Sequence, residues 1–222
     1  TPQGSPLSPL LSNIVLNELD WELDKRSLTF VRYADDCQIY VSSRRAGERV
    51  KQNLTHFISR TLRLKVNEAK SAVDRPWNRT FLGFTFSAGR GYKVKVSGKA
   101  LQTLKAKIRV LTRRTRGHSI RQVIAELKKS LLGWKAYFGI AEIQSPLRDL
   151  DKWIRRRLRC YLWKQWGRSG YRRLRALGVD RQLAWNTAKS AHGPWRLSQS
   201  PALYRALPKR YFRDLGLVEL SA

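Results

Sequence analysis

The chain has 222 residues, of which 42% are hydrophobic, so it can bury a sizeable core arranged as one large or two small domains. It carries 45 Lys and Arg against 16 Asp and Glu, and the net charge of +29 far exceeds what solubility requires and indicates a polyanionic partner, nucleic acid above all. An anionic membrane is the other candidate, but no apolar run approaches the roughly 20 residues of a span and no signal peptide is visible, so we expect a soluble, cytoplasmic protein.

The cysteines and histidines predict neither a disulfide framework nor a zinc site. Cys37 falls in a core-like strand and Cys160 in a basic helix. The three histidines, His56, His118 and His192, are scattered without metal-ligand spacing. Each is therefore expected to be a surface or packing residue.

The first 26 residues place turn-forming residues ahead of an apolar stretch with helical spacing. We predict a loop, in which Gly4 lets a ligand approach the backbone, leading into a buried helix. The apolar positions of that helix are Leu10, Leu11, Ile14, Val15, Leu19 and Leu23. Charged residues, Asp20 and Asp24 among them, are expected to form its solvated end.

Two adjacent carboxylates, Asp35 and Asp36, lie between residues 29–33 and 37–41, two runs rich in β-branched and aromatic residues. This pattern predicts a hairpin with the acids at its tip. A hard divalent cation would relieve the repulsion between the two carboxylates and keep coordination positions open for phosphate oxygens, as phosphoryl transfer requires. A surface turn that happens to contain two aspartates is the plainer interpretation. The flanking strands, which fix the pair in place, favour the metal site.

The following segment continues the same alternation. We predict a helix after Ser43, a strand over residues 80–86, a turn at 89–91 and a half-buried strand over 92–96. The order helix, hairpin, helix, hairpin predicts an α+β unit, an antiparallel sheet with helices on one face.

From residue 97 the chain becomes helical and basic. Three amphipathic helices with short connections predict a small bundle, with a domain boundary near residue 98. Residues 77–222 carry a net charge of +26, against +3 for residues 1–76. Aromatic residues among the arginines offer stacking surfaces for unpaired bases, so we favour nucleic-acid contact over a merely solvated face. The pattern leaves open which aromatics stack and which fill the core.

Four motifs, in this order, resemble the later sequence blocks of reverse transcriptases: Pro-Gln-Gly-Ser-Pro-Leu-Ser-Pro at 2–9, Tyr-Ala-Asp-Asp at 33–36, Leu-Lys-Val-Asn-Glu-Ala-Lys at 64–70 and Phe-Leu-Gly-Phe at 81–84. Two later stretches, residues 133–139 and 150–157, resemble the maturase-specific region of bacterial group II intron-encoded proteins. Retron, diversity-generating and telomerase-type enzymes share the Asp-Asp block, but the maturase-like stretches favour the group II intron family. The resemblance covers essentially the whole chain.

The resemblance implies an α+β fold, with a partial polymerase palm followed by an all-α thumb or maturase bundle. Residues 1–98 would form the palm with a primer-grip-like hairpin, residues 99–166 the thumb (domain X), and residues 167–222 a basic tail that binds RNA or DNA. Asp35 and Asp36 would be catalytic and bind Mg²⁺, Asp35 more directly. The nucleotide and template pocket would comprise Pro2, Gln3, Gly4, Tyr33, Ala34 and Lys70, and the primer grip Phe81, Leu82, Gly83 and Phe84.

Two of these assignments have a plainer alternative. Lys70 is also consistent with an ordinary solvent-exposed lysine, and residues 81–84 are also consistent with a strand of the core. The predicted RNA-binding residues share a positive charge and lie on the basic helices: Lys105, Arg109, Arg113, Arg114, Lys152, Arg155, Arg156, Arg157, Arg159, Arg172 and Arg173.

The function implied is that of the C-terminal part of a group II intron RNA-directed DNA polymerase and maturase, which copies RNA into DNA and assists intron splicing. Its partners would be intron RNA, an RNA template with a DNA primer, deoxynucleoside triphosphates and an N-terminal fingers-palm segment.

Because the sequence begins in mid-motif without methionine, we expect a fragment that lacks the family's upstream metal-binding aspartate. Asp20 and Asp24 fall on the wrong element to replace that aspartate. The isolated chain should therefore bind RNA, and Mg²⁺ weakly, without extending a primer. The alternative is a non-enzymatic module that binds intron RNA. A structural DNA-binding protein acting by charge alone does not explain the ordered motifs.

Overall fold

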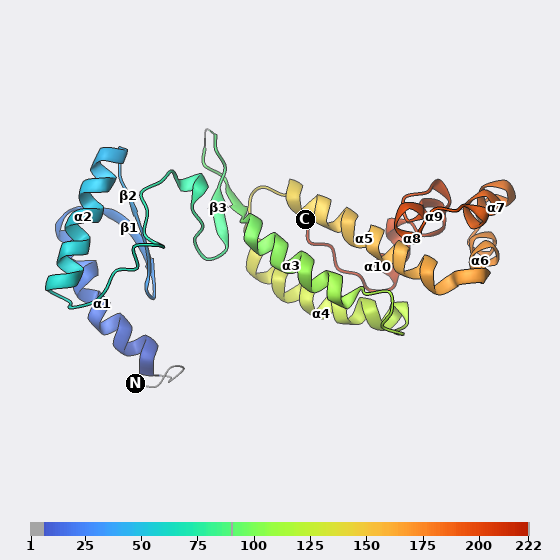
Figure 1. Cartoon of the computed structure of the whole chain (residues 1–222), viewed down its shortest axis with the longest axis horizontal. Coiled ribbons are helices and arrows are strands. Elements are labelled where there is room, and N and C mark those ends of the chain that lie inside the picture. The colour runs from blue at the N-terminus through green and yellow to red at the C-terminus, as the bar shows by residue number, and fades with distance from the viewer. Residues whose placement is uncertain (1–6, 90, 222) are drawn as a thin grey trace. The chain divides into compact units, whose positions relative to one another are not determined.

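The structure is a computed structural model that describes residues 7–89 and 91–221, and it divides into two compact units, Thr1–Thr85 and Phe86–Ala222 (Figure 1). It is mostly helical with two small antiparallel sheets, which agrees with the predicted α+β class. The first unit contains α1 (Leu7–Lys25), β1 (Thr29–Tyr33), β2 (Asp36–Tyr40), α2 (Arg44–Arg60) and η1 (Pro76–Asn78).

The first sheet is the predicted hairpin of β1 and β2. Its strands pair antiparallel from Thr29 opposite Tyr40 to Tyr33 opposite Asp36. Side chains alternate between the two faces of a strand, and the face that carries Phe30 and Ile39 packs against both helices. The core of this unit is formed by Leu19 and Leu23 of α1 and Leu54 of α2, with partly buried neighbours from the hairpin. Both helices thus cover one face of the hairpin.

Helix α1 confirms the predicted helix, but the prediction that it is buried throughout is wrong. Leu19 and Leu23 are buried, whereas the apolar residues of its first half are exposed, namely Leu10, Leu11, Ile14 and Val15. The hairpin and α2 pack against the second half of the helix only. Periodicity predicted which face is apolar, but it does not predict how much of that face has a packing partner.

The predicted strand over residues 80–86 is also wrong in its first half. Phe81 and Phe84 face each other across a tight turn, and each backbone N–H donates to the carbonyl of the other at 2.9 Å. Leu82 and Gly83 form the turn with φ of 51° and 79°, the pair of positive values that defines a type I′ turn. The strand β3 (Phe84–Phe86) follows the turn and pairs with β4 (Val94–Val96). The primer-grip-like motif is therefore itself a tight hairpin turn.

In the second unit, β4 is followed by the three predicted amphipathic helices, α3 (Gly98–Leu111), α4 (Ile120–Phe138) and α5 (Ser145–Trp166), which lie side by side in Figure 1. Serine hydroxyls cap the first two, and Ser119 forms a full capping box with Gln122. Shorter helices follow: η2 (Gly167–Ser169), α6 (Gly170–Ala176), α7 (Arg181–Lys189), α8 (Pro194–Leu197), α9 (Pro201–Ala206) and α10 (Lys209–Asp214). Of these, η2, α6 and α8 pack against α5, in which residues 158–162 are all buried, and α7 and α9 pack against α6.

The last described residues run back along the bundle toward the start of α5 (Figure 1). The buried carboxylate of Asp151 holds this stretch, since it accepts the backbone N–H groups of Leu220 and Ser221 at 3.0 Å and the Ser221 hydroxyl at 2.8 Å. Lys135 Nζ donates to the Glu219 carbonyl at 2.8 Å. One buried acid thus fixes the returning stretch to the central helix.

Replacing Asp151 with Ala is expected to lower the free energy of unfolding by about 2–3 kcal/mol, because buried backbone donors lose their acceptor. Urea unfolding followed by far-UV circular dichroism measures the loss, and limited proteolysis should then cut the returning stretch first. Asp149→Ala is the matched control, since Asp149 lies on the same helix and is exposed. Equal stability of the two variants would contradict the role given to Asp151.

Candidate active site and nucleic-acid interface

The predicted metal-binding pair lies at the tip of the β1–β2 hairpin. Ala34 and Asp35 form its two-residue turn, and Ala34 has a φ of 52°, the positive value that a type II′ turn requires at this position. Asp36 opens β2 directly opposite Tyr33. Both aspartates and Tyr33 are exposed. The two aspartates are therefore consecutive in sequence, open to solvent and carried at a short, fixed turn.

Arg32 ties this turn to helix α1, a role that the sequence did not indicate. Its guanidinium donates to both carboxylate oxygens of Asp20, with Nε 2.7 Å from Oδ1 and Nη2 2.5 Å from Oδ2. Its Nη1 donates to Asn13 Oδ1 and to the carbonyl of Ala34, each at 2.9 Å. Asp20, expected at a solvated helix end, is thus a fixed ion-pair partner. The arginine holds the backbone directly before Asp35.

The described residues contain no group of three or more His, Cys, Asp or Glu side chains placed to hold a metal ion. Two carboxylates still fit Mg²⁺, which usually keeps several waters and is bound by one or two carboxylates together with substrate phosphates. Asp20 is committed to Arg32 and does not serve as a third ligand. The carboxylates of Asp35 and Asp36 therefore fit a magnesium site in which a substrate phosphate supplies further ligands.

Cys37 follows Asp36 in β2, and burial raises the pKa of its thiol to about 11. We expect native Cys37 to react with iodoacetamide at pH 8 about a hundredfold more slowly than an ordinary cysteine, because the thiolate is the reactive form. The folded state keeps this proton longer, so the free energy of unfolding should fall as the pH rises from 9.0 toward 11. Peptide mass mapping of native and urea-unfolded protein measures the difference, and equal alkylation of both would contradict the prediction.

Of the other residues predicted to line the nucleotide and template pocket, the structure describes only Lys70. Pro2, Gln3 and Gly4 lie outside the described residues. Lys70 is exposed in a turn, where its backbone N–H lies 3.1 Å from the Asn67 carbonyl and its own carbonyl accepts from Arg79 Nη2 at 2.8 Å.

The predicted RNA-binding residues differ in how far their side chains are exposed. The exposed ones are Arg109, Arg113, Arg114, Lys152, Arg172 and Arg173. Lys105, Arg155, Arg156 and Arg157 are half-buried. Arg159 is only 4% exposed and donates from Nε to the Leu207 carbonyl at 3.2 Å. Arg159 therefore stabilises the fold and does not offer its guanidinium at the surface.

Arg157 joins the middle of α5 to the C-terminal end of α3. Its Nε donates to Thr112 Oγ1 at 2.5 Å, and its guanidinium carbon lies 5.3 Å from the centroid of the Trp153 ring. The guanidinium of Arg109 lies over the same ring at 5.7 Å. The Trp153 ring thus makes cation–π contacts with both Arg109 and Arg157.

The acidic side chains of the second unit are engaged locally. Glu126 binds Arg116 at 2.8 Å and contacts His118 at 3.1 Å, and the hydrogen bond from Arg116 holds the pKa of Glu126 below its usual value. The other six accept from backbone N–H groups or pair with nearby basic residues: Glu142, Asp149, Asp151, Asp180, Asp214 and Glu219. The exposed arginines are therefore left as a positive surface that an external polyanion can neutralise.

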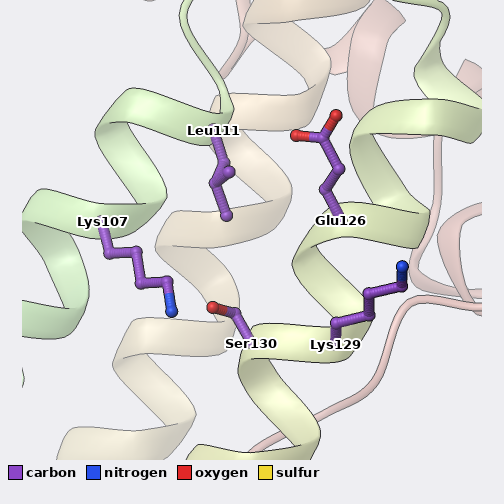
Figure 2. Close-up of a pocket in the computed structure, with 5 residues that line it drawn as sticks. All are labelled: Lys107, Leu111, Glu126, Lys129 and Ser130. Atoms are coloured by element: carbon purple, nitrogen blue, oxygen red, sulfur yellow. The ribbon is translucent and has the colours of Figure 1, made fainter.

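A shallow groove of about 340 Å³ lies between α3 and α4 (Figure 2). Leu111 is the apolar residue of its lining, and Lys107 extends toward Ser130 from the facing helix. Glu126 and Lys129 complete it. This open groove carries two lysines and one glutamate beside its apolar surface, and its lysines are suited to contact with a nucleic-acid backbone. In the part of the chain that the structure describes, no helix is long and apolar enough to cross a bilayer.

Comparisons with known proteins match both units. The family model described as reverse transcriptase (RNA-dependent DNA polymerase) matches residues 1–86, and the model described as group II intron, maturase-specific domain matches residues 101–178. The retron Ec86 reverse transcriptase of Escherichia coli is 29% identical over 112 residues, which are 48% of this chain and 34% of that protein. The chain thus spans about a third of the length of this curated relative.

The first match and the retron relative show that the segment carrying Asp35 and Asp36 is similar to reverse transcriptases. In the same chain this segment is followed by the match to the model described as group II intron, maturase-specific domain. The predicted resemblance to group II intron reverse transcriptase/maturases is therefore confirmed.

Proposed function

We propose that this chain is the C-terminal part of a group II intron RNA-directed DNA polymerase and maturase. The carrying observation is the exposed Asp35–Asp36 pair on a hairpin tip that Arg32 fixes, within the segment matched to reverse transcriptases. The strongly basic helical unit that follows supplies the surface for RNA. The Asp35–Asp36 hairpin and the basic helical unit together favour an enzyme that copies an RNA template and also binds that RNA tightly.

In this proposal Asp35 and Asp36 hold Mg²⁺. When bound, the metal would activate the primer hydroxyl and neutralise charge on the triphosphate. Tyr33 and Ala34 would lie beneath the primer end and the incoming nucleotide, and Lys70 would neutralise the departing pyrophosphate. The tight turn at residues 81–84 would support the primer strand. Arg32 contributes by holding the carbonyl of Ala34, and through it the position of Asp35.

Two-metal catalysis needs carboxylates on both sides of the cations, and the described residues supply one side. We infer that an upstream fingers-palm segment supplies the other side. Supporting this, the first half of α1 exposes a run of apolar side chains next to the residues that hold the hairpin tip: Leu7, Leu10, Leu11 and Ile14. A contiguous exposed apolar face of this kind is typical of a surface that another polypeptide segment covers.

For the second unit we propose binding to structured intron RNA. The proposal is tested by the affinity of the chain for a group II intron RNA and for a random RNA of equal length, each measured across a range of salt concentrations. Charge alone would give both RNAs the same affinity and the same steep salt dependence. A preference for the intron RNA that survives at high salt supports maturase function, and equal binding throughout would overturn it.

The second candidate is a non-enzymatic module that binds intron RNA and takes no part in polymerisation. The observation that favours it is the absence of a third carboxylate near Asp35 and Asp36 in the described residues. The two candidates make the same prediction for RNA binding. They differ in primer extension, because the module would not extend a primer with any added segment.

A further inference from the structure

Two arginines of α5 lie against aromatic rings from the tail. The guanidinium carbon of Arg156 is 3.8 Å from the centroid of the Trp195 ring in α8, and that of Arg159 is 3.9 Å from the centroid of the Tyr204 ring in α9. The two arginines are three residues apart on one helix, so they lie on the same side of α5, about 4.5 Å apart along its axis. The Arg156–Trp195 and Arg159–Tyr204 cation–π pairs are therefore neighbours along α5.

Both guanidinium groups are held in place by neutral acceptors. Arg156 contacts the Ser198 hydroxyl at 3.4 Å and the Trp195 carbonyl at 3.3 Å. Arg159 donates to a backbone carbonyl, and its buried Nη1 has no hydrogen-bond partner among the described residues. These contacts fix the positions of two positive charges without cancelling them. A cation held against one face of an aromatic ring gives a rigid, positively charged support for that ring.

The rings themselves remain accessible. Trp195 is 38% exposed and Tyr204 is 48% exposed, although each has a guanidinium packed against it. Each ring is followed in sequence by an exposed arginine, Arg196 after Trp195 and Arg205 after Tyr204. Each ring therefore presents part of its surface to solvent beside an exposed cation.

We propose that Trp195 and Tyr204 form a stacking platform for neighbouring unpaired bases of RNA, with Arg196 and Arg205 contacting the phosphates on either side. Single strands are bound by aromatic rings that stack on bases beside cations that follow the backbone. The choice of RNA rests on the proposed function, since Arg156 and Arg159 lie within the segment matched to the maturase-specific domain. The platform extends the interface to tail residues 195–205, beyond that matched segment.

Binding of three labelled 12-mers, measured by fluorescence anisotropy at one salt concentration, tests the platform. The probes are unstructured single-stranded RNA, single-stranded DNA of the same sequence and an RNA duplex. Trp195→Leu and Tyr204→Leu are each expected to weaken binding of the single-stranded RNA about tenfold, within the range known for loss of one base stack. Binding of the duplex should change less than twofold. Trp185→Leu is the matched control, since this tryptophan is 49% exposed in the same unit and packs with Lys189 and Tyr171.

Equal losses on single strand and duplex would overturn the platform, and a loss confined to the DNA strand would overturn the choice of RNA. If the leucine variants unfold, wild-type protein is photocrosslinked to single-stranded RNA that carries 5-iodouridine. Crosslinks at Trp195 or Tyr204 then support the platform, and crosslinks confined to other residues contradict it. If the intron RNA is preferred but these rings prove irrelevant, only this inference fails. If the rings matter but intron RNA is not preferred, only the proposed function fails.

Discussion

Asp35→Asn is expected to lower the rate of DNA synthesis by the chain, combined with the proposed fingers-palm segment, roughly a thousandfold or more. A metal ion supplies several kcal/mol of transition-state stabilisation, and every 1.36 kcal/mol corresponds to a factor of ten in rate. The substitution removes a metal ligand while keeping the shape of the side chain. Single-turnover primer extension on an RNA template measures the rate, and RNA binding measured in parallel should be unchanged.

Asp24→Asn is the matched control for this result. Asp24 is exposed on α1 and loses the same charge, yet it lies outside the hairpin. The control should retain full activity. Synthesis by the Asp35→Asn protein at a rate near that of the control would remove this carboxylate from the metal site.

Arg32→Ala is expected to produce the second largest effect, a loss of about 2 kcal/mol in the free energy of unfolding and a fall of about tenfold in the rate of synthesis. The substitution removes hydrogen bonds to a carboxylate and to the turn, and hydrogen bonds to charged groups typically stabilise by amounts of this size. Because Arg32 positions the turn without touching substrate, the concentration of Mg²⁺ needed for half-maximal rate should also rise. Urea unfolding and magnesium titration of primer extension measure the two effects.

Arg32→Lys separates the two roles of this side chain, since lysine keeps the charge but cannot reach Asp20 and Ala34 with a planar fork. We expect Arg32→Lys to recover part of the stability and little of the magnesium affinity. Arg49→Ala, at an exposed position of α2, is the control for loss of a positive charge. An unchanged magnesium requirement in Arg32→Ala would show that the arginine only stabilises the fold.

The hairpin and the three bundle helices were predictable because their signals are local. Runs of β-branched and aromatic residues on both sides of Asp35 and Asp36 indicated two strands, and the spacing of Leu104 and Ile108 indicated one face of a helix. The turn at residues 81–84 was missed for a local reason too. Gly83 lies inside an apolar run that resembles a strand, although an isolated glycine there often marks a turn or bulge.

The arrangement around Arg32 was not predictable, because it joins residues 12 and 19 positions apart that only packing brings together. One signal was available. Alternation placed Arg32 on the inner face of β1 with Phe30, where a charged side chain requires a partner. Arg159 was misjudged for a related reason: residues 158–162 of α5 are all buried, with Arg159 bound to Leu207 of the tail and Tyr161 bound to His118 before α4, so helical periodicity no longer separates a buried face from an exposed face.

Primer extension on an RNA template with Mg²⁺, by the chain alone and by the chain with its upstream fingers-palm segment added in trans, tests the central claim most directly. We predict no extension by the chain alone and extension by the mixture, lost again when the chain carries Asp35→Asn. Extension by the chain alone would show that its own residues complete the metal site. No extension by a mixture that still binds intron RNA selectively would show that the chain is an RNA-binding module and not part of a polymerase.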